Sequence, residues 1–172
     1  MRFLSLCALL TALIAVSSLP EMAEAAVPKS GSIAILVKGP SPQHAASTAS
    51  IVTQELIAKG YKVVDPQKLE SIRKSKAAAL ALDGNVDAIM KLGKQYGFST
   101  MITLQVKAGD PRINEFQLYT GTASVAVMAT GSNGSQLYAD TVSGKQVGYT
   151  EDEAAQKSLE AAAKLAVSRM TQ

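Results

Sequence analysis

Hydrophobic residues change their spacing halfway along the chain, and each half predicts different elements. The run at 32–39 is continuously apolar and β-branched, as in a strand buried on both faces. In the second half, apolar and polar residues alternate, which predicts long strands at 98–109, 115–130 and 135–149.

Helical spacing separates the early strands. After Ser41, apolar residues recur every three or four positions, which predicts a helix that Ser41 caps and Gly60 ends. A short strand is expected at 61–65. Further helices are expected at 66–82, at 86–96 and, after a group of acidic residues, at 151–170.

The predicted order is therefore β-α-β-α-α-β-β-β-α. Helical crossovers place the early strands parallel to their neighbours, whereas Asn133 and Gly134 predict an antiparallel hairpin in which both residues have positive φ. The fold expected for 32–172 is one α/β domain, a sandwich with a mixed parallel and antiparallel sheet.

The N-terminus has the pattern of a secretory signal at 1–25: a positive charge, an apolar core and small residues before the expected cut after Ala25. The apolar core is too short for a membrane span. Cys7 lies inside this segment, too early for a lipid-anchored cysteine, so we expect a soluble periplasmic or secreted protein. Residues 26–31 then form a flexible lead-in.

Composition excludes several function classes. Cys7 is the single cysteine of the chain, so the mature protein has no disulfide, thiolate metal site or cysteine nucleophile. The net charge is +3, the basic residues are scattered, and there is no tryptophan. These features argue against a nucleic-acid partner, which needs basic and aromatic platforms.

Gly144 and Lys145 raise the question of a phosphate-binding loop. Such a loop needs a glycine five positions before the glycine–lysine pair and a hydroxyl residue after it. Ala139 and Gln146 occupy those positions. The pair is instead interpreted as the end of a strand, followed by a helix that begins with a capping box formed by Thr150 and Glu153.

The remaining candidate motifs are incomplete as well. Residues 83–87 resemble the opening of a calcium loop, but Ala88 and Lys94 stand where glycine and glutamate are required. His44 is the only histidine, and the acids at 151–153 suit a helix N-terminus. We therefore predict no catalytic residues, no metal site and no cofactor.

Three stretches carry a resemblance to known proteins: ELIAKGYKVVDPQKL (55–69), AIMKLGKQYGFSTMITLQV (88–106) and VGYTEDEAAQKSLEAAAKLA (147–166). They resemble modules of the bacterial envelope. These are the soluble part of the curli secretion channel subunit, the middle domain of flagellar assembly protein T, the N-terminal domain of the Tol-Pal β-propeller protein, and the activators of penicillin-binding proteins. The resemblance implies an α/β envelope module.

The function expected is that of a non-enzymatic envelope protein, an assembly or accessory factor that contacts other envelope proteins or itself. The strand at 135–148 has no obvious neighbour on its far side, and such an edge invites strand addition. The polar connector expected at 107–115 is a second candidate surface. The interaction residues expected are Arg112, Gln136, Tyr138, Asp140 and Lys145.

Two further possibilities concern ligands. One is a small-molecule pocket between the sheet and the helix at 151–170, although its alanines Ala155, Ala162 and Ala166 favour close packing over a cavity. The other is contact with an anionic surface through basic residues near one helix end, which are Lys68, Arg73, Lys74 and Lys76.

Overall fold

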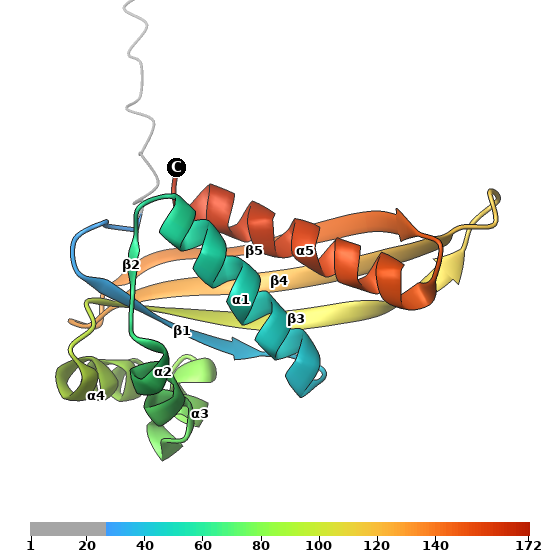
Figure 1. The fold of residues 1–172 in the computed structure, drawn as a ribbon. Helices are drawn as coiled ribbons and strands as arrows, with labels where there is room; N and C mark the ends of the chain where they lie inside the picture. Colours follow the sequence, from blue (N-terminus) through green and yellow to red (C-terminus); the bar gives the residue numbers. More distant parts are fainter. Residues whose placement is uncertain (1–26) are drawn as a thin grey trace, which may run out of the picture.

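The computed structural model describes residues 27–172 and places one five-stranded sheet between two groups of helices (Figure 1). The signal segment expected at 1–25, with Cys7, lies outside the described residues, as does Ala26 of the lead-in. Among residues 27–172, no helix is long and apolar enough to cross a membrane.

The strands lie in the order β2-β1-β3-β4-β5, with β1 parallel to β2 and β3, and the last three antiparallel. This mixed sheet confirms the predicted fold class. The strands are β1 (Ser32–Lys38), β2 (Lys62–Val63), β3 (Thr100–Ile113), β4 (Tyr119–Gly131) and β5 (Gln136–Gly148).

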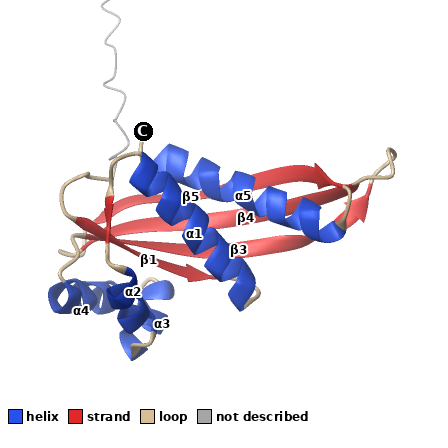
Figure 2. Ribbon diagram, viewed as in Figure 1, coloured by secondary structure: helices blue, strands red, loops and turns tan. Residues whose placement is uncertain are grey.

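The helices divide between the two faces (Figure 2). Two of them, α1 and α5, lie side by side over one face, and the other three pack near one end of the opposite face. The helices are α1 (Pro42–Ala58), α2 (Pro66–Arg73), α3 (Lys76–Leu82), α4 (Val86–Tyr96) and α5 (Glu151–Met170).

The single helix expected at 66–82 is divided into α2 and α3. Ser75 ends the first by donating its hydroxyl to the Ile72 carbonyl, and its Oγ accepts from the Ala78 N–H, 3.2 Å away. A serine prefers this capping position to a helix interior, because its short side chain reaches the backbone.

Strand alternation builds two cores. Ile33, Ile35 and Leu104 are fully buried toward α1 and α5, while Ala34 and Leu36 are buried toward α2, α3 and α4. Because successive side chains of a strand point to opposite faces, the continuous apolar run of β1 supplies both cores at once.

Two local expectations were wrong. Residues 107–113 of the expected connector belong to β3, where a bulge between Gly109 and Arg112 takes up Pro111. The hairpin after β4 forms as predicted, but Gly134 alone has positive φ, and its N–H donates to the Gly131 carbonyl. The turn is therefore a three-residue loop with a left-handed last residue, and Asn133 instead accepts the Ser135 N–H through its side chain.

Candidate interaction surface

The long free edge of the sheet is β5. This strand has 13 residues and pairs only with β4, whereas the opposite edge, β2, has two residues. A short edge offers few unpaired backbone groups, so β5 is the edge at which another strand can add.

Asp140 covers one point of this edge. Its Oδ1 accepts the N–H of Thr141 at 2.7 Å, which indicates that this N–H points away from β4. Since backbone groups alternate along an antiparallel strand, the N–H groups of Ser143, Lys145 and Val147 point to the same free side. The uncovered part of the edge therefore follows Thr141.

Asp140 also joins the edge to α5. Arg169 donates to its Oδ2 at 3.0 Å, and the Tyr138 hydroxyl donates to the same oxygen at 3.1 Å. The Arg169 hydrogen bond, helped by the Thr141 N–H and the Tyr138 hydroxyl, lowers the pKa of Asp140 below its usual value. The carboxylate thus stays charged and keeps β5 attached to the end of the last helix.

The five expected interaction residues do not form one patch. Tyr138 and Asp140 lie on the α5 side of β5, where Tyr138 is buried. Lys145 lies on the opposite side of the sheet. Arg112 is an exposed residue of β3 that pairs with Thr120 of β4. Gln136 is exposed at the start of β5.

The basic residues expected to meet an anionic surface, Lys68, Arg73, Lys74 and Lys76, are all exposed on α2 and α3 or between them. Arg73 donates to Glu70 at 2.8 Å, so part of this charge is compensated.

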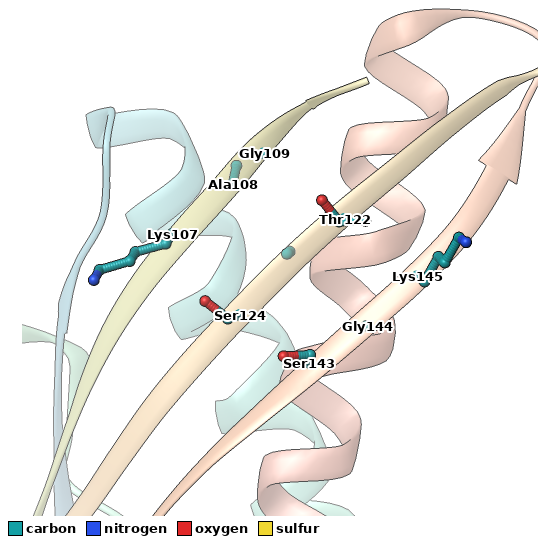
Figure 3. A pocket seen from close by; sticks show the side chains of 9 residues that line it. Lys107, Ala108, Gly109, Thr122, Ser124, Ser143, Gly144 and Lys145 are labelled. Carbon is teal, nitrogen blue, oxygen red and sulfur yellow. The ribbon is translucent and has the colours of Figure 1, made fainter. Parts of the chain in front are cut away.

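The sequence interpretation missed a groove on the side of β3, β4 and β5 that faces away from α5, which we call the open face. A hollow of about 500 Å³ lies there, with Lys107 and Lys145 on its outer strands (Figure 3). The hydroxyls of Thr122, Ser124 and Ser143 lie between them. The alternation of polar residues along these strands could have indicated this face, because polar residues at every second position mark the side of a strand that is exposed to solvent.

The opposite side of the same strands explains the glycine of the glycine–lysine pair. A Cβ on Gly144 would overlap the Ser158 carbonyl oxygen, and one on Gly121 would overlap the Ala154 carbonyl. The backbone of α5 thus lies directly against β4 and β5, at a distance that only glycine permits. Gly144 serves packing, and no phosphate-binding loop is formed.

The start of α5 shows the predicted capping box with one difference. Thr150 Oγ1 accepts the Glu153 N–H at 3.2 Å, and the short hydrogen bond to the Glu153 carboxylate comes from the N–H of Tyr149, at 2.7 Å. The hydrogen bond from Lys157, followed by that from Tyr149, lowers the pKa of Glu153.

The second hollow lies between the N-terminal turns of α1 and α5, with a volume of about 390 Å³. His44 and Asp152 line it, and the His44 Nδ1 lies 2.6 Å from the Ser41 hydroxyl. Ala162 and Ala166, by contrast, are fully buried against the sheet. Within residues 27–172, no three His, Asp or Glu side chains gather as a possible metal site.

This fold is that of a bacterial envelope lipoprotein-type domain. Residues 41–171 match the family model of the TP0693-like lipoprotein C-terminal domain, and the chain belongs to that family. The family agrees with the expected resemblance to bacterial envelope proteins, and none of the four groups named from the sequence is confirmed. A search of curated proteins found no match.

The solved structures with a similar fold include the following two. Lipoprotein GNA1162 from Neisseria meningitidis aligns with a TM-score of 0.55 and 18% identity, covering 80% of this chain and 98% of its own. The PelC dodecamer from Paraburkholderia phytofirmans aligns with a TM-score of 0.51 and 10% identity, covering 85% and 91%. At these identities the likeness shows the fold alone.

Proposed function

We propose that the protein is a non-enzymatic accessory factor of the bacterial cell envelope, which acts by pairing the free edge of β5 with a strand of another envelope protein or of a second copy. The observation that carries the proposal is the long unpaired edge of β5 in a domain of a lipoprotein family. The expected signal at 1–25 would bring it to the periplasm or beyond.

The composition of β5 supports strand addition. Edge strands that avoid pairing carry several charges, prolines or bulges. From Thr141 to Gly148, β5 has one charged residue, Lys145, and no proline. Every second residue in this part directs its N–H and carbonyl groups outward, so an added strand finds a row of regularly spaced partners.

Asp140 gives this edge a direction. The carboxylate already occupies the Thr141 N–H and is itself held by Arg169. An incoming strand therefore gains most of its backbone hydrogen bonds between Ser143 and Val147, at the end of β5 that leads into α5.

The test compares two variants of one residue, because Ser143 directs its N–H outward. Ser143→Pro removes that donor without removing a hydrogen bond to β4, and Ser143→Ala retains it. A photo-crosslinking amino acid at Gln146 should trap a discrete partner in cells of the wild type and of Ser143→Ala. The same crosslink should be lost in Ser143→Pro.

Thermal unfolding of both variants must show that each is folded. The same crosslinker at Lys94, which is exposed on α4, is the positional control. A partner that crosslinks equally well in Ser143→Pro, or equally from Lys94, would contradict pairing at the β5 edge.

A further inference from the structure

The open face carries a one-sided distribution of charge. The residues of β3, β4 and β5 that the strand register places on this face include no aspartate or glutamate, and the exposed Asp110 lies in the bulge between Gly109 and Arg112, where the register gives it no partner. Three basic residues do occur: Lys107, Arg112 and Lys145. None of the six ion pairs found in residues 27–172 includes any of the three.

Strand register sets the spacing of the two lysines. Lys107 lies in line with Ser124 and Ser143, and Lys145 lies in line with Thr122 and Gly109. The two Cα atoms are thus two strands and two residues apart, which is about 12 Å from ordinary sheet spacings. Each lysine can meet a different anionic group of one extended ligand.

Small residues keep the space between the lysines hollow. Gly109 has no side chain, and Ser124 and Ser143 have short ones. The lining hydroxyls can both donate and accept hydrogen bonds, whereas the lysines only donate. The groove thus offers a mixed set of partners for hydroxyl groups, beside two positive charges for acids.

Two more residues of β3 lie on either side of Lys107 along the strand. Gln105 donates to the Leu82 carbonyl at 3.1 Å and connects the sheet to the end of α3. Arg112 lies beyond the groove in the other direction, in line with Thr120 and Val147. A ligand that joins Lys107 to Lys145 therefore crosses the three strands between these two positions.

We propose that the open-face groove binds an acidic polysaccharide, a chain whose carboxylates meet Lys107 and Lys145 and whose hydroxyls meet Thr122, Ser124 and Ser143. No aromatic ring lines the groove, so stacked bases of a nucleic acid find no platform there. This inference goes beyond the edge pairing proposed above, since it concerns side chains of the sheet face.

The affinity expected is modest and depends on salt. The lysine ammonium groups are exposed, so their attraction to carboxylates is screened within about 8 Å at physiological ionic strength. Binding therefore comes from several weak contacts along one chain, and longer oligosaccharides should bind more tightly than short ones.

The experiment measures fluorescence anisotropy of labelled polygalacturonate oligosaccharides with the purified protein, with neutral dextran as the uncharged comparison. Lys107→Glu should weaken binding about tenfold or more, as expected for the loss of a charge-assisted contact. Lys107→Ala should weaken it less. Lys59→Glu, on the exposed end of α1, changes the net charge equally and should leave binding within about twofold, since its charge is remote from the groove.

Several outcomes would overturn the proposal. Equal losses of affinity in Lys59→Glu and Lys107→Glu would show that the polysaccharide is attracted by the net charge of the protein alone. Binding of polyglutamate but not of polygalacturonate would assign the groove to an acidic peptide. Because Lys107 lies on β3, two strands from the free edge, crosslinking at β5 should survive Lys107→Glu, so the two proposals fail separately.

Discussion

The two faces of β4 and β5 are built from alternate residues of the same strands, yet one face packs closely against a helix and the other is exposed to solvent. Toward α5, Gly121 and Gly144 let the helix backbone approach the strands until nothing larger fits. On the open face, Thr122 and Lys145 remain in water. Gly144 and Lys145 are adjacent in the sequence but lie on opposite faces of the sheet, where Gly144 packs against α5 and Lys145 is exposed. A sequence motif that combines the two residues therefore does not correspond to one site in the structure.

The difference indicates where binding can evolve. A face on which a helix backbone touches strand backbone has no space for a ligand and tolerates little change. Beyond the end that α2, α3 and α4 cover, the open face contributes little to the core, so its residues there are free to be selected for contacts. Substitutions should therefore be costly on one face and nearly neutral for stability on the other.

The largest effect is expected from Leu159→Ala in α5, whose side chain is 1% exposed. The cavity should lower the free energy of unfolding by about 3 kcal/mol. Val147→Ala on the open face, where the side chain is 46% exposed, should cost less than about 1 kcal/mol. Urea denaturation measures both, and equal losses would contradict the contrast between faces.

Gly144→Ala should come next, with a loss of about 2 kcal/mol, because the added methyl group forces α5 away from β5. Ser143→Ala on the same strand is the matched control and should change stability by about 0.5 kcal/mol or less. A neutral Gly144→Ala would show that α5 can shift without penalty.

Thr150→Ala should cost about 1 kcal/mol, since the Glu153 N–H at the start of α5 loses its acceptor. Thr150→Ser retains the hydroxyl and should stay close to the wild type. Thermal unfolding of the three proteins side by side measures the effect of the cap.

The smallest effect concerns pH. The folded protein holds the pKa of Asp140 below its usual value through Arg169, so the ionised carboxylate stabilises the fold at neutral pH. This contribution, about 0.5 kcal/mol for a partly exposed pair, should vanish as the pH falls through the lowered pKa. Urea unfolding of the wild type and Asp140→Asn should therefore differ at pH 7 and converge only once the pH falls below the lowered pKa of the folded protein.

Much of the fold followed from local patterns. Alternation located β3, β4 and β5, and the cap at Ser41 located the start of α1. Local patterns gave the wrong loop length for the hairpin at Asn133. Hairpin loops of two and three residues favour the same residue types, and they differ in how the flanking strands pair. The extension of β3 past Pro111 depends likewise on its pairing with β4.

The candidate surface was only partly predictable. The free edge could be predicted from the order of the strands. The hydrogen bond between Asp140 and Arg169 could not, because it joins residues 29 positions apart and has no local sequence pattern. Alternation marked Lys107 and Ser124 as polar positions. It did not indicate that α2, α3 and α4 cover only one end of that side of the sheet, because helix placement depends on the whole core.

The free edge of β5 has a geometric consequence for any pair of copies joined there. Antiparallel pairing of two identical strands places a two-fold axis perpendicular to the sheet. Rotation about that axis leaves the open faces of both copies on the same side, and α1 and α5 of both on the other. One symmetric surface would then present two grooves in opposite orientation, and a single long ligand could span the junction between the copies.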